Sequence, residues 1–269
     1  MTETHGAAFF DLDRTLISGA SPFVFGIAAW RNKMIPTKSL LTDGFNALIF
    51  KLFGASDEKS AAIRDRILGA VEGANQADLM SLNEEIGPTL MRKVRPESRS
   101  LVDMHHEAGR DTWIVSASPI ELVEPLAHAL GMTGGIATRS EVVDGVYTGR
   151  LDGPFVYGTG KTEAIEKLAA ERGYDMRLCY AYSDSVSDLP MLELVGHPVA
   201  VNPDGALESL AQRRGWPIVI FSRGTKKVVA TTTALTGAAG LASATYALGR
   251  RHGRIQAEAA RGRRAMPWR

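Results

Sequence analysis

The sequence has one cysteine, no signal-peptide pattern and almost no net charge. Because Cys179 is alone, an intramolecular disulfide is excluded, and its apolar neighbours predict a core residue and not a catalytic thiol. The first residues lack a basic segment followed by an apolar segment, so we expect no signal peptide and a cytoplasmic location. The six histidines show no metal-ligand spacing. These absences exclude a disulfide-stabilised secreted protein and a histidine-based metal centre.

The net charge of +1 hides an uneven distribution along the chain. Residues 1–225 carry 22 basic and 29 acidic residues, whereas residues 226–269 carry nine basic residues and one acid. With 269 residues, of which 45% are hydrophobic, the composition excludes general disorder, collagen-like repeats and a multi-span membrane protein. We therefore expect an acidic folded body followed by a basic tail.

Residues 228–248 are a long run without charge, 21 residues flanked by Lys226-Lys227 and Arg250-Arg251. The length allows a membrane span, but the run is mostly Ala and Thr, and a span would export the Arg-rich end against the positive-inside rule. The alternatives are a helix packed on the body, a helix on a membrane surface, or a disordered tail bound to anionic lipid. Residues 226–269 thus predict a tail that governs location, with an anionic membrane surface as a candidate partner.

Short apolar runs alternate with helical patterns through most of the chain. Strands are predicted at 7–10, 112–115, 178–182, 199–201 and 218–221. Helices are predicted at 96–108, 120–130, 162–171, 189–194 and 206–213. This alternation predicts an α/β fold with an open parallel, Rossmann-like sheet, whose chemistry lies at the carboxyl ends of the strands.

Two insertions interrupt the alternation. Four stretches with helical spacing follow the first strand without a strand between them, which predicts a small helical bundle: 21–32, 36–52, 57–71 and 76–93. Asp144-Gly145, inside the alternating pattern of residues 135–151, predicts a β-hairpin. We expect a catalytic core of residues 1–17 and 96–225, a helical cap of residues 18–95, and the tail of residues 226–269.

Polar residues follow several of the predicted strands or open the helices after them: Asp11, Asp13, Ser116, Lys161, Asp184 and Asp188. Each has a simpler explanation, because Asp is common in turns and Ser and Asp cap helices. A lysine in the first turn of a helix, however, opposes the helix dipole unless an anion lies beside it. Their joint placement at one sheet edge predicts a site that combines carboxylates, a hydroxyl and an amine.

The first of these segments, Phe9-Phe10-Asp11-Leu12-Asp13-Arg14-Thr15, resembles the first motif of the haloacid-dehalogenase superfamily, an apolar strand followed by Asp-x-Asp-x-Thr. Ser116, Lys161 and the pair Asp184 and Asp188 match the superfamily's second, third and fourth motifs in order. The resemblance covers about residues 7–222. The helical insertion resembles the cap of the phosphoserine-phosphatase-like branch, subfamily IB, and residues 134–150 resemble that branch's β-hairpin flap.

The resemblance implies a phosphomonoester hydrolase that depends on Mg²⁺. The metal ligands would be Asp11, Asp184 and the backbone carbonyl of Asp13, because hard cations prefer oxygen ligands. Asp11 would form an aspartyl-phosphate, and Asp13 would act as general acid and then as general base.

The remaining motif residues would support that chemistry. Ser116 and Lys161 would hold the transferring phosphoryl oxygens, where charge stabilisation has the largest effect. Asp188 would support either the metal ligands or Lys161. The implied partner is a small phosphorylated substrate, and no nucleic acid partner is expected.

Two positions depart from the family pattern. Ser183-Asp184-Ser185 stands where many members have Gly-Asp-Gly, but the acids keep their spacing. Ala20 stands where phosphoserine phosphatases carry a Glu that pairs with the substrate's amino group, which argues against phosphoserine.

Two alternatives to a small-molecule phosphatase remain open. One is a phosphatase or phosphotransferase that acts on a lipid or glycerol phosphate ester, which the aromatic-rich cap and the basic tail favour. The other is a non-catalytic regulator with the same fold. The complete motif set argues against the regulator, since a binding protein does not need Asp13.

Overall fold

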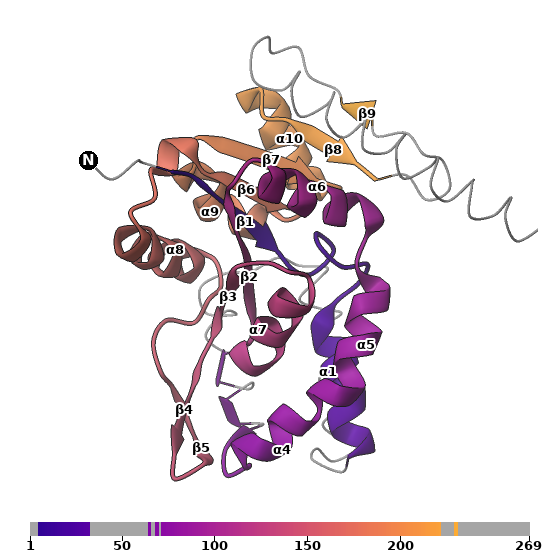
Figure 1. Cartoon of the computed structure of the whole chain (residues 1–269), viewed down its shortest axis with the longest axis vertical. Coiled ribbons are helices and arrows are strands. Elements are labelled where there is room, and N and C mark those ends of the chain that lie inside the picture. Colours follow the sequence, from indigo (N-terminus) through magenta and orange to yellow (C-terminus); the bar gives the residue numbers. More distant parts are fainter. Residues whose placement is uncertain (1–4, 33–63, 66–67, 70, 222–228, 231–269) are drawn as a thin grey trace, which may run out of the picture.

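The computed structural model describes residues 5–32, 64–65, 68–69, 71–221 and 229–230, and its centre is a seven-stranded sheet (Figure 1). The strand order is β3-β2-β1-β6-β7-β8-β9. The strands are β1 (Ala7–Asp11), β2 (Asp111–Pro119), β3 (Gly134–Thr138), β6 (Tyr180–Ser183), β7 (His197–Val201), β8 (Ile218–Ile220) and β9 (Val229–Ala230). Neighbouring strands are parallel except β8 and β9, which confirms the predicted Rossmann-like α/β fold.

Helices cover both faces of this sheet. They are α6 (Pro96–Glu107), α7 (Ile120–Ala129), α8 (Thr159–Arg172), α9 (Leu189–Leu194) and α10 (Gly205–Arg214). Phe10 of β1 packs into a core with α6 and α7, whereas Phe9 packs into a second core with α8, α9 and α10. All five residues of β1 are therefore buried, as expected for a parallel strand covered on both sides.

The position of β1 in the sheet determines where the site lies. From β1 the chain passes to β2 and β3 on one side, and the later strands β6, β7 and β8 lie on the other side. In open α/β sheets ligands bind in the crevice at such a switch point, outside the carboxyl ends of the strands. Asp11 is the last residue of β1 and so occupies this crevice.

The segment predicted as the cap, residues 18–95, contains α1 (Ser21–Arg31), α4 (Gln76–Ser81) and α5 (Asn83–Lys93), which lie together at one end of the molecule (Figure 1). The prediction of helical structure over 76–93 is confirmed, but it forms two helices separated at Leu82. There the amides bond to carbonyls three residues earlier, Leu82 to Leu79 and Glu85 to Leu82, which is tighter than an α-helix. The helix predicted at 36–52 and most of that at 57–71 lie outside the described residues.

The predicted hairpin is present as β4 (Ser140–Val143) and β5 (Val146–Leu151), which pair antiparallel. Asp144 and Gly145 have φ values of 50° and 79°, as the tight turn between twisted strands requires. The expected start of the flap at residue 134 is wrong, since Gly134–Thr138 is the sheet strand β3. These residues are mostly buried and pair in parallel with β2, so they complete the sheet and do not belong to the hairpin.

The hairpin is hydrogen-bonded to the cap. Gly73 donates to the carbonyl of Tyr147 at 2.9 Å, and Tyr147 donates to the carbonyl of Ala74 at 3.0 Å. The Tyr147 side chain is buried in the same core as the cap helices α4 and α5. The flap and this part of the cap are therefore joined by backbone bonds and by packing.

The start of the basic tail adds an edge strand to the sheet. Val229–Ala230 forms β9 and pairs antiparallel with β8, with Val219 opposite Ala230. Within the described part of the chain, no helix has the length and apolar character needed to cross a bilayer. Residues 231–269, to which most of the tail prediction refers, lie outside the described residues.

Candidate active site

Asp11 and Asp13 lie at the carboxyl end of β1 and face different partners. Asp11 is buried, and its Oδ1 accepts a hydrogen bond from Lys161 Nζ at 2.7 Å. The Asp13 Oδ1 accepts a hydrogen bond from the backbone amide of Ser21 at 2.6 Å. The turn after β1 thus separates two carboxylates that an extended strand would have placed on one side.

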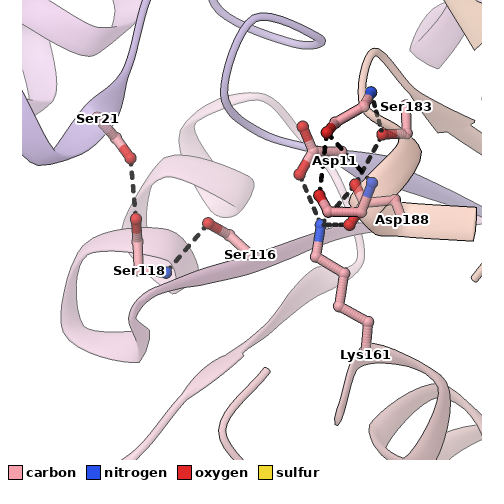
Figure 2. Close-up of polar contacts among 9 residues, drawn as sticks. Asp11, Ser21, Ser116, Ser118, Lys161, Ser183 and Asp188 are labelled. Atoms are coloured by element: carbon pink, nitrogen blue, oxygen red, sulfur yellow. Dashed lines mark hydrogen bonds and ion pairs between the residues drawn. The ribbon is translucent and has the colours of Figure 1, made fainter. Parts of the chain in front are cut away.

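Lys161 joins Asp11 to the end of β6. Its Nζ donates to Asp188 at 2.8 Å as well as to Asp11, and Ser183 Oγ donates to Asp188 Oδ2 at 2.7 Å (Figure 2). We call Asp11, Lys161, Ser183 and Asp188 the lysine cluster. Asp188 therefore contacts the lysine, which is one of the two roles that the sequence left open for it.

The start of α8 places Lys161 in this cluster. A Cβ on Gly160 would collide with the carbonyl oxygen of Phe155, so glycine is required where the chain turns into the helix. Lys161 lies in the first turn of α8 and is almost fully buried. Burial alone would lower its pKa, but the Asp11 and Asp188 carboxylates outweigh it and raise the pKa above its ordinary value. These two carboxylates are the anions that the sequence analysis required beside the lysine.

Asp184 follows β6 and lies next to an arginine from the first motif. Arg14 Nη2 is 2.8 Å from Asp184 Oδ2, which is buried and accepts no hydrogen bond of favourable geometry from the described residues. Arg14 has a φ of 65°, a conformation that is uncommon for residues other than glycine. The turn after β1 therefore directs one cation towards the fourth motif.

Ser116 belongs to a line of serines that leads from β2 to the cap. Its Oγ accepts a hydrogen bond from the backbone amide of Ser118 at 3.2 Å, and the hydroxyls of Ser118 and Ser21 are hydrogen-bonded at 2.9 Å (Figure 2). We call Ser116, Ser118 and Ser21 the serine chain. All three residues are buried. Because Ser116 Oγ accepts from an amide, its own proton is free to bond to a phosphoryl oxygen.

The path of β2 brings the serines into the site. The sequence predicted a strand at 112–115 that stops at Ser116, but β2 continues to Pro119, and its pairing with β3 shifts between Ser116 and Pro119. Such irregularities redirect side chains next to functional sites. The predicted strand end was therefore wrong by three residues, while the placement of Ser116 at the sheet edge was correct.

Negative charge exceeds positive charge in the site. Four carboxylates meet two cationic side chains: Asp11, Asp13, Asp184, Asp188, Lys161 and Arg14. Burial raises the pKa of Asp11 well above its ordinary value; Lys161 opposes this, and the other three carboxylates add to it. Burial also raises the pKa of Asp13, and it raises that of Asp184 to about 7. The fully ionised site has two uncompensated negative charges, as many as a divalent cation neutralises.

The donor atoms fit a hard cation such as Mg²⁺. Among the described residues, no three side chains of His, Cys, Asp or Glu gather closely enough to hold a metal ion. The ligand set implied by the sequence does not need three, because it consists of the Asp11 and Asp184 carboxylates and the carbonyl of Asp13. Oxygen donors and the charge excess both favour this set over softer metals, and Arg14, which is 2.8 Å from Asp184 Oδ2, is the cation that a metal ion would meet there.

The structure brings all six predicted site residues to one edge of the sheet, and it adds four that the sequence analysis missed. Arg14 and Ser183 adjoin motif residues in the sequence, and their position beside Asp13 and Asp184 was the available signal. Ser21 and Ser118 gave a weaker signal. Ser118 contacts Ser116 within β2, whereas Ser21 reaches Asp13 and Ser118 only because α1 begins against the end of β2.

Comparison with known proteins agrees with this architecture. Residues 8–193 match the family described as haloacid dehalogenase-like hydrolase. The chain is 40% identical over 245 residues to phosphoserine phosphatase SerB1 of Mycobacterium tuberculosis, covering 90% of this chain and 80% of that protein. It is 33% identical over 223 residues to a histidinol-phosphatase of Neisseria meningitidis, covering 80% and 98%.

A solved structure has a similar fold. A protein of unknown function from Bordetella pertussis superimposes with a TM-score of 0.71 at 29% identity, covering 80% of this chain and 98% of that one. The family match spans more than half of the sequence and includes the first, second, third and fourth motifs. The chain therefore belongs to the haloacid dehalogenase-like hydrolases, as a phosphatase of the phosphoserine-phosphatase-like branch.

Proposed function

We propose that the protein is a Mg²⁺-dependent phosphomonoesterase that forms an aspartyl-phosphate on Asp11. The observation that carries this proposal is the contact of Lys161 with both Asp11 and Asp188, at 2.7 and 2.8 Å, at the switch point of the sheet. A buried amine beside a buried carboxylate stabilises both the nucleophile and the phosphoryl group that it receives. Membership of the hydrolase family supports the same assignment.

The metal would be held by Asp11, Asp184 and the carbonyl of Asp13. When bound, Mg²⁺ supplies positive charge that lowers the repulsion between a carboxylate and a phosphate dianion. The excess of negative charge in the site supports this role, since burial and neighbouring carboxylates raise the pKa of Asp11. A cation there would favour the ionised form that the nucleophile needs.

In the first half of the reaction, an Asp11 carboxylate oxygen attacks phosphorus and the bond from phosphorus to the leaving oxygen breaks. Asp13 transfers its proton to the leaving oxygen, so the alcohol departs neutral. The raised pKa of Asp13, caused first by burial, favours the protonated form that this step requires. The products are the alcohol and the phosphorylated Asp11.

In the second half, water attacks the phosphoryl group and the bond to Asp11 breaks. Asp13, now ionised, accepts a proton from the water, which restores both carboxyl groups and releases inorganic phosphate. Ser116 donates its free proton to a phosphoryl oxygen in both halves. Lys161 holds another of these oxygens while Asp188 fixes the ammonium group.

A small organic phosphate without a required amino group fits the site best. Ala20 precedes α1 and stands where a carboxylate would meet a substrate ammonium group. Its neighbour Ser21, which contacts Asp13, is also uncharged. Of two relatives, one is named as a phosphoserine phosphatase and the other as a histidinol-phosphatase, so substrate differs within the family.

An ester with an apolar group is the second candidate. Helix α1 exposes Phe23 and Ile27, which are 52% and 44% accessible and four residues apart on one side of the helix. Exposed apolar surface on the cap would suit a lysophosphatidate or a similar glycerol phosphate ester. A phosphate-release screen that includes glycerol phosphate and lysophosphatidate separates the two candidates, because only the apolar ester would gain from this surface.

Trapping the intermediate tests the proposed reaction. Asp13→Asn should still allow Asp11 to attack p-nitrophenyl phosphate, whose leaving group needs little protonation, but it should slow hydrolysis of the phosphoenzyme. Mass spectrometry of the variant should then show one added phosphoryl group on the peptide that contains Asp11.

The control is the double variant Asp11→Asn/Asp13→Asn, which lacks the nucleophile and should keep the fold, because each Asn has nearly the shape of the Asp that it replaces. It should carry no phosphoryl group under the same conditions. Phosphate found on another residue, or no Mg²⁺-dependent release of p-nitrophenol by the unsubstituted enzyme, would refute the proposed reaction.

A further inference from the structure

The serine chain ends at the carboxylate of Asp13. Ser21 is the first residue of cap helix α1, and its amide donates to Asp13 Oδ1 at 2.6 Å. Hydrogen bonds from both the backbone and the side chain of Ser21 lower the pKa of Asp13 against the effect of burial. Negative charge is favourable at a helix N-terminus, so the position of Asp13 at the start of α1 adds to this hydrogen bond.

Ser21 is in turn held by the core. Its hydroxyl is 2.9 Å from that of Ser118, and neither residue exposes more than 7% of its surface. The Ser118 backbone amide donates to Ser116 Oγ at 3.2 Å. Both ends of this chain reach proposed catalytic groups, and only Ser21 comes from the cap.

The hydroxyl protons allow one arrangement that satisfies every group. If Ser118 donates to Ser21 Oγ, the Ser21 proton remains available for the Asp13 carboxylate. The amide and the hydroxyl of Ser21 can then both donate to the Asp13 carboxylate. Proton transfer is sensitive to such placement, because a shift of about 1 Å can reduce a rate about 100-fold.

We propose that Ser21 is a positioning residue for Asp13, through which the cap sets the orientation of the acid that protonates the leaving group. This inference rests on the proposed function, since it assigns a role relative to the acid of that reaction. Ser118 acts one step further away, by holding the Ser21 hydroxyl.

Leaving-group dependence tests this role, because a general acid matters most when the departing oxygen is basic. The two probes are phenyl phosphate and p-nitrophenyl phosphate, which have similar shapes but a more and a less basic leaving oxygen. The measured quantity is kcat/KM with Mg²⁺, which covers the step in which the leaving group departs. For Ser21→Ala we expect kcat/KM to fall about tenfold more with phenyl phosphate than with p-nitrophenyl phosphate.

Two further variants calibrate this ratio. Asp13→Asn sets the upper limit, because it removes the acid altogether. Ser118→Ala should shift the ratio in the same direction as Ser21→Ala but by less. Equal losses on both substrates in Ser21→Ala would overturn the inference, since a merely structural role lowers both rates together.

Ser98→Ala is the matched control. Ser98 is also buried, at 2% exposure, and its hydroxyl donates to the carbonyl of Thr15 at 2.7 Å, without contacting Asp13. Its loss should lower the melting temperature while leaving the ratio of the two substrates at the wild-type value. A ratio that shifts in Ser98→Ala as far as in Ser21→Ala would also overturn the inference.

Asp11→Asn separates this inference from the proposed function. If Asp11→Asn keeps its activity, the proposed function fails and the role of Ser21 fails with it. If Asp11→Asn is inactive but Ser21→Ala leaves the ratio unchanged, the proposed function stands and only the role of Ser21 is overturned.

Discussion

The lysine cluster and the serine chain lie at the same edge of the sheet but are built from different materials. The lysine cluster is ionic and comes from core elements alone, namely β1, α8, β6 and the turn after it. The serine chain is made of neutral hydroxyls and joins the core strand β2 to the cap helix α1.

Because of this difference, we expect the lysine cluster to contribute more to the stability of the fold, and the serine chain to affect the reaction with little effect on stability. A buried ion pair that loses one partner leaves an unpaired charge, which costs about 3–5 kcal/mol, so the lysine cluster is coupled to folding. A neutral hydrogen bond contributes only about 1 kcal/mol, so the serine chain can change without unfolding the protein. In the proposed mechanism, the cap would therefore act on the acid, Asp13, without disturbing the nucleophile, Asp11.

The largest effect is expected at the nucleophile of the lysine cluster. Asp11→Asn removes the attacking carboxylate but keeps an oxygen that can accept from Lys161, so the fold should persist. Hydrolysis of p-nitrophenyl phosphate should fall by about three orders of magnitude or more. Asp175→Asn, which changes a carboxylate paired with Arg177 away from the site, is the matched control and should keep full activity.

Loss of Lys161, the cation of the same cluster, should lower both the activity and the stability of the protein. Lys161→Met leaves the Asp11 and Asp188 carboxylates without their shared ammonium group, which should cost about 3–5 kcal/mol of unfolding free energy. Activity should fall about 100-fold or more, because the phosphoryl group loses its cation. Urea unfolding and a p-nitrophenyl phosphate assay measure the two effects.

A double variant shows whether the loss of unfolding free energy in Lys161→Met comes from unpaired charge or from lost packing. Lys161→Met/Asp188→Asn removes one of the two stranded charges, so part of the stability should return while the activity stays low. Lys167→Met, on an exposed part of α8, is the control and should change neither quantity. A double variant as unstable as the single one would show that packing, and not charge, holds this side of the site together.

The sequence predicted the lysine cluster better than the serine chain, and the reason is geometric. Asp11 ends one apolar strand and Asp188 comes shortly after another strand of the same parallel sheet, so their convergence follows from the fold class. Lys161 was conspicuous because its charge opposes the helix dipole. Ser21 carries no such signal, because its contact with Asp13 depends on the angle at which α1 meets the core.

The predictions of the fold that were wrong or incomplete have related causes. Helical spacing over residues 76–93 does not reveal the tighter bonds at Leu82 that divide α4 from α5. Gly134–Thr138 is short and begins with two glycines, so its pairing with β2 becomes visible only in the sheet. Periodicity reports which face of an element is apolar, whereas these features depend on neighbours that are distant in the sequence.

Metal binding should distinguish the carboxylate side of the site from the serine chain, because only the carboxylates give an excess of negative charge. Adding Mg²⁺ should raise the melting temperature, corresponding to about 2.7 kcal/mol when its concentration is 100 times the Kd, and EDTA should reverse the change. Asp184→Asn should remove this response, whereas Ser118→Ala should keep it. Differential scanning fluorimetry measures the change in melting temperature. A change in Asp184→Asn as large as that of the wild type would contradict the proposed ligand set.

The smallest effect is expected below the lysine cluster, at His105. Its Nε2 bonds to the hydroxyl of Tyr182 at 2.8 Å, Arg110 donates to its Nδ1 at 2.8 Å, and its ring packs on Phe10, the residue before Asp11. Burial first, and then Arg110 and His106, lower the pKa of His105 from 6.5 to about 3. The buried ring is therefore neutral and accepts from Arg110 while it donates to Tyr182.

This shift destabilises the fold on acidification. Between pH 6.5 and about 3 the unfolded chain binds a proton at His105 that the folded protein does not, so stability falls as the pH falls, by at most about 1.4 kcal/mol per unit. His105→Gln keeps a donor and an acceptor but cannot titrate. Its stability deficit at pH 7 should therefore shrink at pH 5 in urea unfolding experiments.

Comparing His105→Gln with the wild type separates the effect of His105 on the pH dependence of stability from the effect of the site carboxylates. Those carboxylates have raised pKa values, so they stabilise the fold on acidification and act in the opposite direction in both proteins. His128→Gln alters a largely exposed histidine, and its stability should follow that of the wild type at both pH values. If the stability deficit of His105→Gln is equal at pH 7 and pH 5, the packing of His105 against Phe10 does not depend on a neutral ring.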